Sequence, residues 1–135
     1  MNMQDFTSDR VRILVADDEA YILQVVALKL RNAGFEVMTA YDGEEALSCV
    51  RSYGADLVVT DLQMPGLTGI ALARAMAADP KLAGIPIMML TARGHLLHEG
   101  EADSANIARV VQKPFSPRAL LEEIEALLAE RRRAA

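Results

Sequence analysis

The sequence is poor in cysteine, aromatic residues and long apolar runs, and each shortage excludes a class of protein. Of its 135 residues, one is cysteine, none is tryptophan and 4% are aromatic. The single Cys49 excludes an internal disulfide framework and fits a reducing compartment. Few aromatic residues argue against a platform on which nucleic-acid bases stack. No apolar run approaches the roughly 18 residues of a membrane span, and residues 1–5 lack the basic and apolar regions of a signal peptide. We therefore expect a cytoplasmic protein with no membrane insertion.

Positive charge is also in short supply. Lysine and arginine number 14 against 19 aspartate and glutamate residues, so the formal net charge is -5. Because a broad nucleic-acid interface needs a positive excess, we expect no nucleic-acid partner. The length fits one domain with a sizeable core. We expect a flexible tail over residues 1–10, the domain over 11–130, and a second tail over 131–135, where three arginines favour the negative end of the last helix.

Short apolar runs alternate with segments of helical spacing along the chain. The runs lie at 11–16, 35–40, 56–60, 85–90 and 108–112, and the helical segments lie near 22–33, 42–50, 68–79 and 116–128. Strands that are apolar almost throughout are typical of a parallel sheet covered by helices on both faces. With right-handed crossovers, the pattern predicts a doubly wound α/β fold with a five-stranded parallel sheet.

Capping residues mark several helix ends. Gly34 follows the first helical segment, where a helix C-cap belongs. Asp42 with Glu45 three residues later forms a capping-box pattern. Ser116 followed by Pro117 indicates an N-cap and a proline at the first helical position.

The segment between the fourth and fifth strands is a weak helix candidate. Residues 95–106 contain Gly100, Asp103, Ser104 and Asn106, all poor helix formers. We expect a short, irregular or mobile helix there. His95 and His98 have a spacing that can bind a metal on a helix, but no cysteine or third histidine lies nearby, so exposed loop histidines are the favoured interpretation.

Chemistry gathers where the predicted strands end. The first strand ends in Asp17-Asp18-Glu19, the third in Asp61, the fourth in Thr91 and the fifth in Lys113. In open parallel sheets ligands lie beyond these carboxyl ends. Clustered carboxylates need a counter-ion, and Mg²⁺ prefers a few carboxylates together with water and phosphate. Taken singly, each residue is more often a cap or a solvated side chain; together they predict a site for phosphoryl chemistry in which an aspartate can be the nucleophile.

These residues lie in motifs that resemble the receiver domains of two-component response regulators, similar to the stand-alone receivers of chemotaxis. Five motifs in order cover about residues 11–128. They are Ile13-Leu14-Val15-Ala16-Asp17-Asp18-Glu19, Asp42-Gly43-Glu44-Glu45-Ala46, Asp61-Leu62-Gln63-Met64-Pro65-Gly66-Leu67-Thr68-Gly69, Leu90-Thr91-Ala92 and Lys113-Pro114-Phe115. The resemblance implies a flavodoxin-like sheet with strand order 2-1-3-4-5.

The resemblance also implies a role for each residue at the strand ends. Asp61 is expected to accept a phosphoryl group from a phosphohistidine of a sensor kinase or histidine phosphotransfer protein. Asp18, Asp61 and the backbone carbonyl of Gln63 are expected to bind Mg²⁺, with Asp17 acting through a metal-bound water. The expected output is contact with a downstream target protein. Such a domain is no conventional enzyme: it catalyses its own phosphorylation and slow autodephosphorylation.

Other positions of the motifs are expected to bind or tune the phosphoryl group. Thr91, with Ala92 after it, is expected to hydrogen-bond the phosphoryl oxygens, and Lys113 to pair with them. Gln63 and Arg93 are expected to tune the rate of hydrolysis. The Lys113–Pro114 peptide is expected in the cis form, as is common in this family.

One departure from the family pattern concerns the switch. An aromatic residue usually lies three residues before the lysine, but this chain has Val110, and Ser104-Ala105-Asn106-Ile107 replaces the usual small pair upstream. We expect the weak helix at 95–106 to carry the response instead, which amide exchange across 93–110 with a phosphoryl mimic would test.

Three other functions remain in view at this stage. A haloacid dehalogenase-type phosphatase uses a strand-end aspartate with Mg²⁺, but needs Asp-x-Asp where this chain has Asp17-Asp18. A flavin-binding flavodoxin needs a hydroxyl-rich and glycine-rich phosphate loop after the first strand. A degenerate receiver that only docks is the third. An effector domain following Ala135 in a longer protein is a further possibility.

Overall fold

The computed structural model describes residues 10–92 and 106–134 of the chain. The weak helix candidate at residues 95–106 lies outside the described residues except for Asn106, and so do Arg93, His95 and His98. The strands are β1 (Arg12–Ala16), β2 (Glu36–Ala40), β3 (Leu57–Asp61), β4 (Ile87–Thr91) and β5 (Ile107–Gln112). The helices are α1 (Ala20–Asn32), α2 (Gly43–Tyr53), α3 (Gly69–Ala77) and α4 (Pro117–Ala134).

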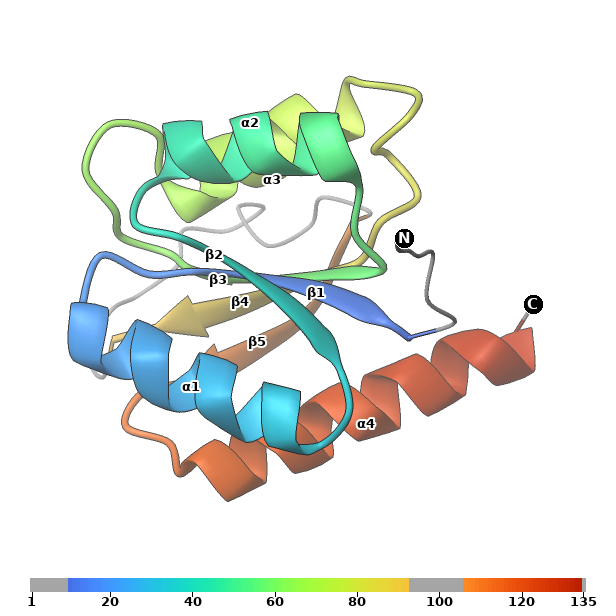
Figure 1. Cartoon of the computed structure of the whole chain (residues 1–135). Helices are drawn as coiled ribbons and strands as arrows, with labels where there is room; N and C mark the ends of the chain where they lie inside the picture. The colour runs from blue at the N-terminus through green and yellow to red at the C-terminus, as the bar shows by residue number, and fades with distance from the viewer. Residues whose placement is uncertain (1–9, 93–105, 135) are drawn as a thin grey trace, which may run out of the picture.

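The five strands form one parallel sheet in the order β2-β1-β3-β4-β5. Helices α1 and α4 cover one face of this sheet, and α2 and α3 cover the other (Figure 1). The doubly wound fold and its strand order are therefore confirmed. Because all strands run the same way, their carboxyl ends, and the loops that follow them, lie along one edge of the sheet.

Two apolar clusters fill the space on the two sides of the sheet. Side chains of a strand alternate between its faces, so Leu14 and Val58 belong to the cluster under α2 and α3. Ile13 and Val59 belong to the cluster under α1 and α4. Strands β3 and β4 are buried along their whole length, which explains their nearly continuous apolar sequence.

The predicted caps are present at the helix ends. The Asp42 carboxylate accepts a hydrogen bond from the Glu45 amide at 2.7 Å. The Glu45 carboxylate accepts one at 2.6 Å from the amide of Tyr41, one residue before the N-cap. The Ser116 hydroxyl accepts a bond from the Ala119 amide at 3.0 Å, and α4 begins at Pro117. These bonds satisfy amides that have no partner within the helix.

The C-terminal boundary differs from the prediction. Helix α4 continues to Ala134, so residues 131–134 are helical, although the sequence assigned 131–135 to a tail. The guanidinium of Arg131 donates a hydrogen bond to the carbonyl of Gly84 at 3.1 Å, which ties the last turns of the helix to the loop before β4. Within the two ranges that the structure describes, none of the helices has the length and apolar character needed to cross a membrane.

Candidate functional site

Three carboxylates converge at the carboxyl edge of the sheet. Asp17 and Asp18 follow β1, and Asp61 is the last residue of the neighbouring strand β3. Each of the three offers a carboxylate oxygen, and these oxygens lie within 4.8 Å of one another. Asp17 is fully buried, Asp61 is nearly so, and Asp18 is exposed. The sequence predicted that these side chains would share one edge, and the fold brings them together.

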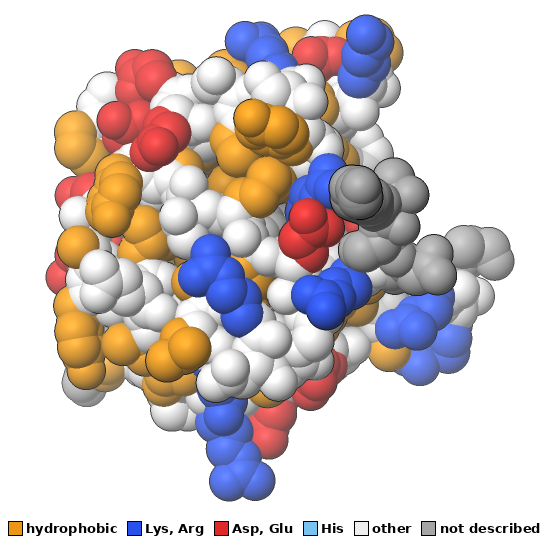
Figure 2. Space-filling view, viewed as in Figure 1, with side chains coloured by type: hydrophobic (Ala, Val, Ile, Leu, Met, Phe, Trp, Pro, Cys, Tyr) orange, Lys and Arg blue, Asp and Glu red, His pale blue; other side chains and the backbone are white. Residues whose placement is uncertain are grey.

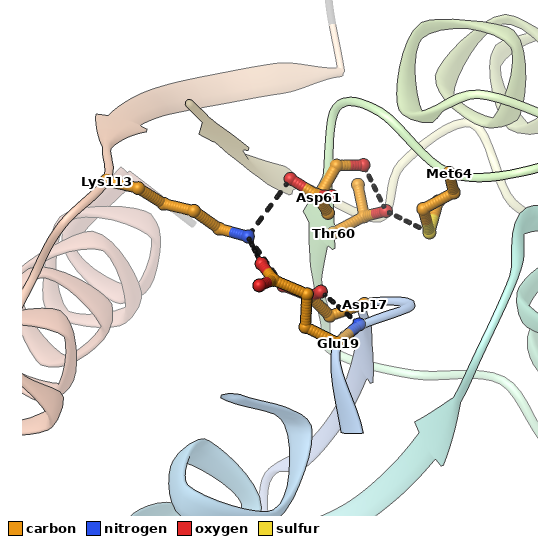
Figure 3. Close-up of polar contacts among 6 residues, drawn as sticks. All are labelled: Asp17, Glu19, Thr60, Asp61, Met64 and Lys113. Carbon is orange, nitrogen blue, oxygen red and sulfur yellow. Dashed lines mark hydrogen bonds and ion pairs between the residues drawn. The ribbon is translucent and has the colours of Figure 1, made fainter. Parts of the chain in front are cut away.

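Lys113 reaches this cluster from the loop after β5. Its Nζ lies 3.0 Å from Asp17 Oδ2, 3.1 Å from Glu19 Oε1 and 3.4 Å from Asp61 Oδ1 (Figure 3). Burial alone lowers the pKa of the lysine, but hydrogen bonds to Asp17 and Glu19 and the charges of Asp17 and Asp61 outweigh that effect. The pKa of Lys113 is therefore raised, and the ammonium stays charged at neutral pH.

Asp61 lies where its own charge is disfavoured. Burial, followed by the nearby charge of Asp17, raises the pKa of Asp61 to about 6, and Lys113 opposes part of the increase. One ammonium therefore does not fully compensate the carboxylates around it. A second cation at this cluster would relieve the repulsion. Carboxylate oxygens are ligands that Mg²⁺ prefers, so the donor set fits that ion.

The two oxygens of Asp17 already have partners within the protein. Oδ1 accepts a hydrogen bond from the Glu19 amide at 2.8 Å, and Oδ2 pairs with Lys113. The amide of Asp17 donates to the carbonyl of Ala40 on β2 at 3.1 Å. These contacts hold Asp17 rigidly behind the more exposed Asp18.

Thr91 and Lys113 are fixed to each other through the backbone. The amide of Lys113 donates to the carbonyl of Thr91 at 2.7 Å, which continues the β4–β5 pairing beyond the strands. Thr91 is buried at the end of β4, beside the strand that carries Asp61. The peptide bond between Lys113 and Pro114 is cis, as expected.

The remaining predicted residues lie around this centre. Gln63 is exposed in the loop after β3, and Ala92 is exposed just beyond Thr91. Val110 is opposite Met89 in the β4–β5 register, and 45% of its surface is exposed. At this exposed position on β5 the chain has a short aliphatic side chain, whereas the family usually has an aromatic ring.

A hollow of about 460 Å³ opens next to Lys113, and the sequence did not predict it. Its walls come from the start of α1 and from the loop between β5 and α4. It is lined by Tyr21, Ile22, Val25, Val26, Ala92, Lys113, Pro114, Phe115 and Pro117. Hydrophobic side chains gather over α1 on the face seen in Figure 2, and Tyr21 and Leu28 of this helix are 78% and 60% exposed. We name this hollow the α1 groove.

Sequence reasoning also missed the part of Glu19 in the site. Glu19 was noted only as an acid after the first strand, yet it is a direct partner of Lys113. For the α1 groove a signal was present: Tyr21, Val25 and Leu28 are apolar residues outside the buried face of the helix. Apolar residues on both sides of a surface helix indicate that the outer side has its own contacts.

The structure is a doubly wound, flavodoxin-like α/β domain with clustered acidic residues and a lysine at the carboxyl edge of its sheet. A sequence profile of the response regulator receiver domain matches residues 13–125. The chain therefore belongs to the response regulator receiver family of two-component signalling. Membership of this family excludes the dehalogenase-type and flavin-binding interpretations.

Individual relatives agree with this assignment. Chemotaxis protein CheY of Pseudomonas aeruginosa is 38% identical over 118 residues, which are 87% of this chain and 95% of that protein. The DNA-binding response regulator MtrA of Mycobacterium tuberculosis is 37% identical over 88% of this chain and 51% of its own length. The chain thus spans about half the length of the MtrA relatives that it matches.

Solved structures show the same fold. Chemotaxis response regulator CheY4 of Vibrio cholerae matches with a TM-score of 0.80 and 32% identity, over 87% of this chain and 98% of that one. A CheY-like receiver domain protein from Methanospirillum hungatei matches with a TM-score of 0.85 and 27% identity, over 94% of this chain and all (100%) of that one.

Proposed function

We propose that the protein accepts a phosphoryl group on Asp61 from a phosphohistidine of a sensor kinase or histidine phosphotransfer protein, in a Mg²⁺-dependent reaction. The observation that carries the proposal is the position of Lys113, whose ammonium lies between Asp17 and Asp61 at the edge of the acidic cluster. A carboxylate nucleophile beside a fixed cation suits the transfer of a charged phosphoryl group.

In the proposed reaction an oxygen of Asp61 attacks phosphorus in line with the phosphorus–nitrogen bond of the donor. The new oxygen–phosphorus bond forms an aspartyl phosphate as the phosphorus–nitrogen bond breaks, and the imidazole of the donor keeps the electron pair. Lys113 neutralises charge on the transferring oxygens, and the hydroxyl of Thr91 donates to one of them. Lys113 changes little in position, because Asp17 and Glu19 already hold its ammonium.

Asp18, Asp61 and the backbone carbonyl of Gln63 are the proposed direct ligands of Mg²⁺. Asp17, whose two oxygens have partners within the protein, is proposed to act through a water. When bound, the ion supplies positive charge that offsets the carboxylates and the phosphoryl group. The exposed side chain of Gln63, and Arg93, are proposed to govern how readily water reaches the phosphorus during autodephosphorylation.

The α1 groove is the proposed docking place of the phosphodonor protein. It is apolar, it opens beside Lys113, and it continues onto the exposed residues Tyr21 and Leu28 of α1. A partner helix that covers these side chains would bury apolar surface while its histidine meets Asp61. This contact would speed phosphoryl transfer from a protein donor and would not affect transfer from a small phosphodonor.

The proposed output is phosphorylation-dependent contact with a target protein. A phosphoryl group on Asp61 would shift a two-state equilibrium of the neighbouring loops. Since Val110 supplies no switch ring, we propose that the weak helix candidate at 95–106 carries this response, which amide exchange across 93–110 tests. Unchanged amide exchange across that segment on addition of a phosphoryl mimic would contradict it.

The first test is the intact mass after incubation with phosphoramidate and Mg²⁺. We expect one phosphoryl adduct on the wild-type protein, and none on Asp61→Asn or with a chelator present. Asp56→Asn is the matched control, because it makes the same change just before the other end of β3. If neither phosphoramidate nor a phosphorylated histidine phosphotransfer protein modifies the wild type, the chain is a docking module instead.

The α1 groove has a separate test. Tyr21→Ser should slow transfer from a phosphorylated histidine phosphotransfer protein by about tenfold, the effect of losing one well-packed aromatic contact. Transfer from phosphoramidate should stay at the wild-type rate. Tyr53→Ser is the matched control, since Tyr53 is 66% exposed at the end of α2 and does not line the groove. Equal slowing with both donors would show that Tyr21 acts on the chemistry and not on docking.

A further inference from the structure

The loop between β3 and α3, residues 62–68, rests on the start of α2. The carboxylate of Glu44 accepts a hydrogen bond from the amide of Leu67 at 3.3 Å. A Cβ at Gly43 would overlap the carbonyl oxygen of Leu67, so the helix and the loop meet backbone to backbone. The apex of the loop therefore packs on α2, a helix 23 residues earlier in the chain.

Gly66 makes the same contact from the side of the loop. Its φ of +72° is a left-handed conformation that glycine adopts without strain. A Cβ at Gly66 would overlap the carboxylate of Glu44. Gly43 thus leaves room for the Leu67 backbone, and Gly66 leaves room for the Glu44 carboxylate that lies over the loop.

The ends of the loop are fixed by separate contacts. The amide of Gly69 donates to the carbonyl of Leu62 at 2.9 Å, and the amide of Leu62 donates to Leu90 on β4 at 2.8 Å. The Thr60 hydroxyl donates to the carbonyl of Asp61 at 3.0 Å and lies 3.8 Å from the sulfur of Met64 (Figure 3). With its ends held by β3, β4 and α3, the apex takes its position from α2.

We infer that Glu44 is a positioning residue that holds the 62–68 loop against α2 and thereby strengthens Mg²⁺ binding at the acidic cluster. This inference rests on the proposed function, in which the carbonyl of Gln63 in the same loop is a metal ligand. Glu44 is exposed and is not one of the three clustered carboxylates. Its effect passes through the Leu67 amide, since a loop held in one conformation loses less freedom when the ion binds.

The coupling works in both directions. If the bond from Leu67 to Glu44 favours the metal-bound loop, bound metal must favour that bond to the same extent. Mg²⁺ should therefore slow hydrogen exchange of the Leu67 amide in the wild type, and slow it less in a variant without the carboxylate. Amide exchange thus reports on the loop itself, independently of phosphorylation.

The test compares Glu44→Ala, Glu44→Gln and Glu125→Ala by calorimetric titration with Mg²⁺ and by amide exchange at Leu67. Glu44→Ala should bind Mg²⁺ about two- to fivefold more weakly, the effect of losing one exposed hydrogen bond. Its Leu67 amide should exchange faster than that of the wild type. Glu44→Gln keeps an acceptor oxygen without the charge and should stay close to the wild type. Glu125→Ala removes an exposed carboxylate from α4 and should leave both measurements unchanged.

A second variant acts from the other side of the contact. Gly43→Ala places a methyl group against the Leu67 carbonyl and should weaken Mg²⁺ binding at least as much as Glu44→Ala. Thermal unfolding of each variant checks that the fold is retained. If Gly43→Ala unfolds, the variants at the exposed Glu44 still test the positioning role.

Contrary results separate this inference from the proposed function. If the wild type binds Mg²⁺ and Glu44→Ala binds it equally well, the positioning role is wrong and the proposed function is untouched. If Glu44→Gln is as weak as Glu44→Ala, the carboxylate acts by its charge and the role of the hydrogen bond is overturned. If the wild type binds no Mg²⁺ and takes no phosphoryl group, the proposed function fails and the inference fails with it.

Discussion

Asp61 is placed where ionisation costs free energy, because its carboxylate is buried beside the carboxylate of Asp17. Burial and the charge of Asp17 raise its pKa to about 6, above its ordinary value of 3.8. The folded protein therefore binds a proton at Asp61 more tightly than the unfolded chain does. By linkage, folding stability falls as pH rises from about 4 through about 6.

A substitution of Asp61 tests whether its ionisation lowers folding stability. In metal-free buffer, Asp61→Asn should raise the free energy of unfolding at pH 7 by about 1–3 kcal/mol, because it removes a carboxylate whose pKa is raised from 3.8 to about 6. The gain should shrink as pH falls and vanish below about pH 4, where the wild-type carboxyl is neutral in both states. Urea unfolding between pH 4 and pH 8 measures the difference, and Asp56→Asn is again the control. A gain that does not change with pH would mean that packing, not charge, is responsible.

At the same scale the sequence identified the residues but not all of their partners. Asp17, Asp61 and Lys113 were predicted at the site because strand ends of a parallel sheet share one edge. The pairing of Glu19 with Lys113 depends on side-chain directions that a strand-end argument does not give.

At the scale of single elements, the start of α3 connects the loop after Asp61 to the sheet. The hydroxyl of Thr68 accepts a hydrogen bond from the Ala71 amide at 3.1 Å and caps the helix. Gly69, the first residue of α3, fits directly against the carbonyl of Asp61, where a Cβ would be too close. The start of α3 and the end of β3 are therefore packed as one unit.

Removing this cap should destabilise the protein. Thr68→Ala should lower the free energy of unfolding by about 1 kcal/mol, since one amide of the first turn loses its acceptor. Thr68→Ser keeps a hydroxyl and should cost only a few tenths of that amount. Urea denaturation gives both values. Equal losses in the two variants would mean that the methyl group, and not the hydroxyl, stabilises this turn.

Element boundaries were largely predictable because their signals are local. The cap at Asp42, the start at Pro117 and the turn at Gly34 each depend on residues within one helical turn. The predicted end of α4 was wrong because residues 131–135 were assigned to a tail after the helix. Arg131 instead bonds to Gly84, a partner from a distant loop that no local pattern reveals.

At the scale of the whole molecule, the sheet divides the apolar interior into two parts. Ile87 on β4 belongs to the cluster under α2 and α3, and Ile124 on α4 to the cluster under α1 and α4. Both side chains are completely buried. Because the strands are packed on both faces, neither cluster is stable without the other, and the molecule should unfold in one cooperative step.

Small truncations on opposite faces of the sheet should act independently. Ile87→Val and Ile124→Val should each cost about 0.5–1.5 kcal/mol, the effect of removing one buried methylene. The double variant should lose the sum of the two values to within about 0.5 kcal/mol, because the side chains share no contact surface. Chemical denaturation of the four proteins measures this. A larger departure from additivity would show that the sheet transmits strain between its faces.

The sequence by itself determined the fold class, the strand order implied by the family motifs, most helix caps and the edge at which the acidic residues gather. These depend on periodicity, on local hydrogen bonding and on the geometry common to all parallel sheets.

Tertiary structure alone decided which atoms meet across the chain. Lys113 contacts Asp17 over a separation of 96 residues, and Glu44 contacts Leu67 over 23. The α1 groove likewise exists only once α1 packs beside the loop before α4. Such contacts depend on how helices pack onto the sheet, and the sequence pattern of one element does not contain that information.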